Sequence, residues 1–238
     1  VTDELKARKF AGVVRLEVDD AMPGPLRPWL AAQLDIHADD GYATRNLLTL
    51  SDLTAFGRTY DQEQWAHAVA VRADSAVPVT PEIAGYYGLY QWFMGAEPPA
   101  KDTIGLLMPN YTFLAANLQA VGPNLTPETF RDALFAGAGT TPALTEAFLT
   151  YGDKGFWPDT DYNGVDDATL VWWDPAATGP DEIRKEGTGM WAFVDGGQRY
   201  LPGEWPSEVK LFDPEGAVTI YDTPPPEESP PSYPSPNG

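Results

Sequence analysis

One stretch of the chain carries oxygen-bearing side chains at the spacing of a calcium-binding loop. Residues 159–167 fit the pattern D-x-[DN]-x-[DN]-G through its sixth position and have an acid at the ninth. The calcium ligands predicted from this pattern are Asp159, Asp161, Asn163, the Val165 carbonyl and Asp167. The twelfth position is Leu170 instead of a bidentate glutamate, which excludes a complete EF-hand. The alternative is an Asn163-Gly164 turn that leads into a strand, with its acids in water.

Polar side chains also follow two predicted strands. Asp19 and Asp20 come after the first strand, and Ser51 and Asp52 come after the second. Ligands of open parallel sheets bind beyond the carboxyl ends of the strands, so these four residues are predicted to contact a ligand. A solvated or helix-capping carboxylate is the alternative for each acid.

The familiar catalytic motifs do not occur in the sequence. His37 and His67 lack the spacing of a metal site or a catalytic triad, and there is no Walker loop, G-x-S-x-G elbow or G-x-G-x-x-G after a strand. The absence of cysteine excludes disulfides and thiolate chemistry. We therefore predict a binding protein with no catalytic residue and no catalytic cofactor. The alternative is a carbohydrate hydrolase that uses two carboxylates and stacks its substrate on tryptophan.

The charge of the chain limits its partners. The 238 residues include 35 acidic and 15 basic side chains, which gives a formal net charge of −20. This charge repels nucleic acid and anionic membrane surfaces, so we expect neither as a partner. A small polar solute that is neutral or cationic fits the charge better.

The elements that must position these residues alternate between helix and strand. Helices are predicted over residues 2–9 and 23–34, and strands over residues 12–18 and 45–50. This order predicts an α/β fold in which the two strands are parallel neighbours in a sheet flanked by helices.

The rest of the chain is predicted to hold helices, then loops, then strands. Thr80-Pro81-Glu82 and Thr126-Pro127-Glu128 each combine an N-cap hydroxyl, a first-turn proline and an acid, so each predicts the start of a helix. Another helix is predicted over 111–121, irregular acidic loops over 137–167, and strands over 168–173 and 190–194. Residues 223–238 contain seven prolines and predict an extended or disordered tail.

Four stretches of the sequence resemble a known family. They are LTAFGRTYDQEQWAHA (53–68), GPNLTPETFR (122–131), TDYNGVDDAT (160–169) and RYLPGEWP (199–206). They resemble the actinobacterial branch of ABC-transporter solute-binding-like proteins, which have the type 1 periplasmic fold of the Leu/Ile/Val-binding group. The resemblance is strongest from Asp52 onward.

The resemblance implies a two-lobed fold, of which this chain would be the C-terminal portion. Residues 1–75 would form part of the second ligand-binding lobe, 76–150 a helical segment returning toward the first lobe, 151–203 the loops and strands that complete the lobes, and 204–238 the proline-rich tail. In that family the loops after the strands contact the ligand; they correspond here to Asp19, Asp20, Ser51 and Asp52, with Tyr111 as a further contact.

The function implied by the resemblance is capture of a small polar solute between two lobes and its delivery to a membrane ABC permease. The expected location is extracytoplasmic, with secretion or lipid anchoring directed by a segment upstream of Val1. The aromatic residue and glutamate typical of amino-acid binders are not found at the predicted loops, so the resemblance does not identify the solute.

Overall fold

The computed structural model describes residues 13–17, 44–48, 53–140, 142–206, 208–223 and 230–237. The chain forms two compact units. Unit 1 contains residues 1–73, 169–198 and 206–219, and unit 2 contains residues 74–168, 199–205 and 220–238. The domain boundaries predicted at residues 75, 150 and 203 stay predictions. None of the described helices combines the length and hydropathy that a transmembrane span requires.

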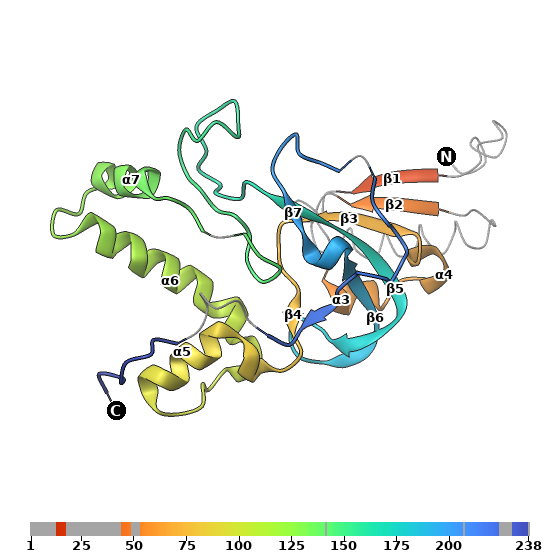
Figure 1. Cartoon of the computed structure of the whole chain (residues 1–238), viewed down its shortest axis with the longest axis horizontal. Coiled ribbons are helices and arrows are strands. Elements are labelled where there is room, and N and C mark those ends of the chain that lie inside the picture. Colours follow the sequence, from red (N-terminus) through yellow and green to blue (C-terminus); the bar gives the residue numbers. More distant parts are fainter. Residues whose placement is uncertain are drawn as a thin grey trace. The chain divides into compact units, whose positions relative to one another are not determined.

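Unit 1 contains a mixed sheet with the strand order β1-β2-β3-β5-β6 (Figure 1). Strand β1 (Val13–Glu17) lies parallel to β2 (Thr44–Leu48), and β2 lies parallel to β3 (Ala68–Arg72). The prediction that the first two strands are parallel neighbours is therefore confirmed, and so is the α/β class. The predicted helices over 2–9 and 23–34 lie outside the described residues.

The other side of the sheet is antiparallel, which the sequence did not predict. Strand β5 (Ala168–Pro180) runs antiparallel to β3, and β6 (Glu186–Phe193) runs antiparallel to β5. The two long strands form a hairpin whose register shifts between Asp174 and Thr178. The sheet is therefore mixed, whereas the sequence predicted a parallel sheet flanked by helices.

Two short helices connect β2 to β3. Helix α3 (Thr54–Gly57) and helix α4 (Gln62–Trp65) are one turn each, and the Asp61 carboxylate caps α4 by accepting a hydrogen bond from the Gln64 amide at 2.9 Å. They bring Trp65 into the core of unit 1.

Tryptophans dominate that core. Trp65, Trp173 and Trp191 are at most 1% exposed, and their ring centroids lie 5.4 to 6.4 Å apart. Successive side chains of a strand point to opposite faces, so Trp172 packs on the other face with Ala192 and Val194. The 3₁₀ turn η3 (Val194–Gly197) follows β6.

Unit 2 is mainly helical in its first half (Figure 1). Helix α6 (Ile104–Val121) packs against both α5 (Gly85–Met94) and α7 (Pro127–Ala136). The 3₁₀ turn η2 (Lys101–Thr103) leads into α6, and the short strands β4 (Val77–Pro78) and β8 (Ile220–Tyr221) pair in parallel. Strand β7 (Arg199–Tyr200) also belongs to this unit.

The two predicted helix starts have different outcomes. Thr126 caps α7 in a reciprocal box with Thr129, as the N-cap pattern predicted. Thr80 precedes only the 3₁₀ turn η1 (Pro81–Ile83), and α5 begins later, at Gly85. Residues 142–167 contain turns and isolated bridges, which agrees with the predicted loops.

Candidate functional site

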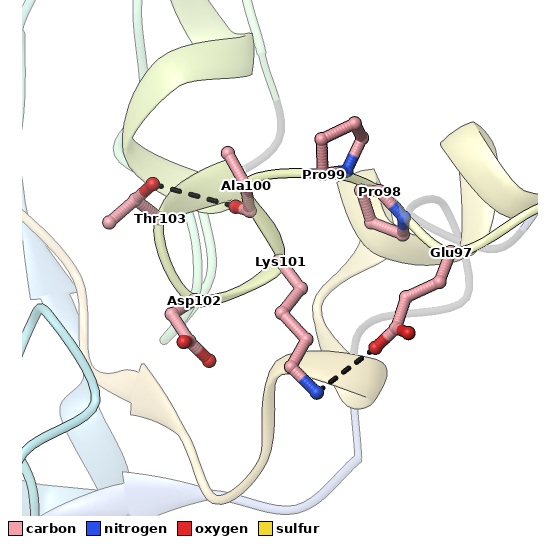
Figure 2. Close-up of a pocket in the computed structure, with 7 residues that line it drawn as sticks. All are labelled: Glu97, Pro98, Pro99, Ala100, Lys101, Asp102 and Thr103. Carbon is pink, nitrogen blue, oxygen red and sulfur yellow. Dashed lines mark hydrogen bonds and ion pairs between the residues drawn. The ribbon is translucent and has the colours of Figure 1, made fainter.

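A surface depression lies at the connection between α5 and α6 of unit 2 (Figure 2). It is lined by consecutive residues, Glu97, Pro98, Pro99, Ala100, Lys101, Asp102 and Thr103. Figure 2 shows the Lys101 side chain extended toward Glu97, and its Nζ lies 3.0 Å from Glu97 Oε1. The Thr103 hydroxyl donates to the Ala100 carbonyl at 3.4 Å.

Lys101 and Glu97 of this depression form an ion pair. The hydrogen bond to Glu97 and the nearby negative charge raise the pKa of Lys101. Burial raises the pKa of the neighbouring Tyr87 on α5, and the carboxylates of Glu97 and Glu82 raise it further. Lysine and tyrosine therefore both keep their protons at neutral pH. The depression offers a protonated lysine to an anion, but the anion would have to displace Glu97.

A buried acidic pair organises the loops of unit 2. Asp166 is 2% exposed, and its carboxylate accepts hydrogen bonds from the Thr150 amide and hydroxyl and from Trp157 Nε1 at 2.9 Å. Asp167 Oδ2 lies 2.9 Å from Arg199 Nε, while its Oδ1 accepts from the Phe148 amide at 3.0 Å. These contacts satisfy both buried carboxylates, which is the condition for burying a charge at tolerable cost.

The residues predicted to bind calcium have different environments. Asp159 and Asn163 are exposed, and Asp161 accepts hydrogen bonds from the Asn163 and Gly164 amides at 2.7 and 3.1 Å. This is the side-chain-to-backbone turn that was the alternative. In the described parts of the chain, no three His, Cys, Asp or Glu side chains are grouped so that they could hold a metal ion. Calcium binding stays a prediction that only titration can test.

The other predicted ligand residues do not meet in the described structure. Asp19, Asp20, Ser51 and Asp52 lie outside the described residues. Tyr111 lies on α6 and is 67% exposed. A ligand role for these five residues stays a prediction.

A network around Arg58 in unit 1 was missed by the sequence analysis. Its guanidinium donates to the carbonyls of Gly189, Lys185 and Gly179 at 3.0, 3.0 and 2.8 Å, and lies 3.7 Å from Asp181. Asp181 in turn accepts from the amides of Ile183 and Lys185. No local pattern could reveal this network, because the carbonyls belong to a hairpin more than a hundred residues away. Through these hydrogen bonds, the Arg58 side chain holds the β5–β6 hairpin against the segment that follows α3.

A second acidic side chain extends the network. Glu182 Oε1 accepts hydrogen bonds from both the amide and the hydroxyl of Thr54 at 2.9 Å, and lies 4.0 Å from Arg72. Helix α3 is thereby joined to the hairpin turn.

Comparison with known proteins identifies similarity for the N-terminal quarter of the chain. The model of the polyphosphate kinase middle domain matches residues 1–56. A polyphosphate kinase of Thermosynechococcus vestitus is 41% identical over 56 residues, which are 24% of this chain and 8% of that protein. No solved structure matches the chain.

These matches contradict several predictions from the sequence. The family found is polyphosphate kinase, so the identification as an ABC-transporter solute-binding protein of the type 1 periplasmic fold is wrong. The predicted function of solute uptake is therefore wrong as well. So are the two predicted partners, a small polar solute and an ABC permease. The relative is a kinase, which also contradicts the prediction that the chain is not an enzyme, and nothing supports the carbohydrate hydrolase.

The source of the error is visible in the sequence. The four stretches that carried the resemblance begin at residue 53, whereas the family match ends at residue 56. The resemblance is strongest from Asp52 onward, so it rests on a part of the chain that the polyphosphate kinase match hardly covers. Residues 1–56 of the chain are similar to the middle domain of polyphosphate kinases.

Proposed function

We propose that the chain takes part in phosphoryl transfer to or from polyphosphate, and that residues 1–56 contribute to this activity. The observation that supports the proposal is the similarity of this segment to the polyphosphate kinase middle domain. The chain spans only 8% of the length of the matched kinase, so the activity of the complete relative is carried to this chain as a proposal alone.

The architecture of unit 1 is consistent with a functional role for the segment. Strands β1 and β2 lie inside the matched residues, while β3 lies outside them and pairs with β2. The end of the match is therefore not the end of the sheet. The segment folds together with residues that the match does not cover.

The distribution of charge favours the matched segment as the part that contacts polyphosphate. Polyphosphate is a polyanion, so its binding requires lysine or arginine. Residues 1–56 contain six basic and nine acidic side chains, whereas the remaining residues contain nine basic and 26 acidic ones. In the described structure, Arg58, Arg72 and Arg199 already face carboxylates. The cluster Lys6, Arg8 and Lys9 is the densest basic group of the matched segment.

The test measures activity and binding with the full chain. We expect ATP to form from ADP when polyphosphate is added, and labelled polyphosphate to bind with an affinity that falls as salt rises. The triple variant Lys6→Gln, Arg8→Gln, Lys9→Gln should lose at least about tenfold in binding, because it removes three cations from one short segment.

A matched control separates local contact from net charge. The variant Arg131→Gln, Lys185→Gln, Lys210→Gln removes the same charge from exposed positions beyond residue 56 and should bind as the unaltered chain does. A folded chain that neither binds polyphosphate nor forms ATP would refute the proposal. Equal losses in the two triple variants would refute the role of the matched segment.

A further inference from the structure

The last described residues of the chain lie against helix α5 of unit 2. Trp92 Nε1 donates a hydrogen bond to the Tyr233 carbonyl at 2.9 Å, and the two rings meet edge to face with centroids 5.5 Å apart. Pro230 lies over Gly88, where an added Cβ would come within 3.1 Å of the proline ring. The tail thus contacts one helix at positions four residues apart, which lie on the same face.

The end of α5 supplies a second point of attachment. The Phe93 carbonyl accepts hydrogen bonds from the Ser235 hydroxyl at 3.1 Å and from Asn237 Nδ2 at 3.2 Å. The last carbonyls of a helix lack partners within the helix, so this one is available to a docking segment. The tail residues satisfy it.

The chemistry of the contacts suits a proline-rich ligand. Proline-rich segments keep an extended conformation before binding, and they are recognised by aromatic side chains together with hydrogen bonds to their free carbonyls. Trp92 provides both the ring and the donor, and Gly88 leaves room for a proline ring. Residues 230–237 contain four prolines.

We propose that the face of α5 formed by Gly88, Trp92 and Phe93 is a binding site for proline-rich extended segments, and that the chain's own residues 230–237 occupy it. The docked tail stays partly in solvent, since Tyr233 is 64% exposed. A ligand held in the same chain competes at an effective concentration on the order of millimolar, so it protects the site from similar segments in other proteins. The tail is then a built-in competitor that regulates access to α5.

The test uses a fluorescent peptide with the sequence of residues 230–237. It should bind a chain that ends at Thr223 at least about tenfold more tightly than it binds the full chain, in which the tail competes. Replacing Trp92 by Phe in the shortened chain should weaken binding about fivefold, since the ring stays and the indole donor is lost. Circular dichroism confirms that each variant is folded.

Two further comparisons keep the result interpretable. A peptide carrying Tyr233→Ala should bind more weakly, whereas one carrying the exposed Ser232→Ala should bind as the original does. If the shortened chain misfolds, the full chain with Pro230→Ala and Tyr233→Ala opens the site instead and should gain peptide affinity. Equal affinity for the open and the full chain overturns the proposal. A dimer of the full chain that dissociates on removal of the tail also overturns it, because the tail would then bind a second copy.

Discussion

Arg58 is the side chain on which the packing of unit 1 depends most directly. It donates to four carbonyls of the β5–β6 hairpin, those of Gly179, Lys185, Gly187 and Gly189, and it faces Asp181, which is 1% exposed. Replacing Arg58 by Gln should lower the free energy of unfolding by about 2 to 4 kcal/mol, because it leaves a buried carboxylate without its cation. Urea unfolding followed by tryptophan fluorescence measures the loss.

The control for Arg58 is another arginine–aspartate pair. Arg131 contacts the neighbouring Asp132 on the surface, where the two side chains are 48% and 65% exposed. Arg131→Gln should change stability by less than about 0.5 kcal/mol. An equal loss in the free energy of unfolding for the two variants would show that the contacts of Arg58 with the hairpin stabilise the protein no more than a surface ion pair does.

Gly57 is required by close packing, not by its backbone angles. A Cβ at this position would lie 2.7 Å from the Trp173 ring. We expect Gly57→Ala to destabilise the protein by about 1 to 3 kcal/mol, since the rigid indole cannot move aside. Gly105 in α6 has open space around it, so Gly105→Ala should be neutral or slightly stabilising in the same thermal melt.

The acids of residues 159–167 allow a direct test of the calcium prediction. Asp161 already binds backbone amides and Asp167 already binds Arg199, so a cation would have to break these bonds. We expect calorimetry to show no uptake at micromolar calcium, the range in which sensor loops bind. Calcium uptake that disappears in Asp161→Ala would contradict this expectation and support the predicted calcium site. Glu146→Ala, which lies outside the loop, is the control and should leave any such uptake unchanged.

At the scale of elements, helix α7 is capped by two residues of its own first turn. The Thr126 hydroxyl oxygen accepts a hydrogen bond from the Thr129 amide, and the Thr129 hydroxyl oxygen accepts one from the Thr126 amide. Thr126→Ala should cost the helix about 1 kcal/mol and accelerate amide exchange in its first turn. Thr160→Ala, an exposed threonine in the loop region, should leave exchange in α7 unchanged.

Elements that depend on neighbouring residues were predictable from the sequence. The alternation of Val13 to Glu17 and the helix predicted between this strand and the next were enough to place β1 parallel to β2. The Thr126 cap likewise needed only residues within one turn. The tail was expected to be extended or disordered, and its docking on α5 was not predicted, because the Trp92 donor lies 141 residues before its acceptor.

Elements that depend on distant partners were not predictable. Strand β5 begins about a hundred residues after β3 yet lies beside it, so no local signal indicated that the sheet becomes antiparallel there. Thr80 carried the same pattern as Thr126 but gave only a 3₁₀ turn, because its side chain makes no cap bond. The α5–α6 depression is built by a loop whose residues form no recognised motif.

At the scale of the whole molecule, the net charge of −20 has a measurable effect on stability. Acidic side chains repel one another, and salt screens this repulsion over a distance of about 10 Å at 0.1 M. The midpoint of thermal unfolding should therefore rise between low salt and 0.1 M sodium chloride. Sucrose of equal osmolarity is the control, and an unchanged midpoint in salt would contradict the expectation.

The same salt series separates folding from ligand binding. Screening should stabilise the acidic chain but weaken the attraction of its N-terminal cations for polyphosphate, so the two effects have opposite signs. The stability effect belongs to the whole acidic chain, whereas the binding effect belongs to a segment that is 24% of it, so the two can be measured separately. The extracytoplasmic location stays a prediction.

The buried tryptophans of unit 1 give that unit its own optical signal. The rings of Trp65, Trp173 and Trp191 lie within 6.4 Å of one another and at steep angles, a geometry in which their electronic transitions couple. Coupled indoles produce a paired circular-dichroism band that vanishes when the rings separate. The ring system lies wholly within unit 1, so this band follows the assembly of that unit without a label.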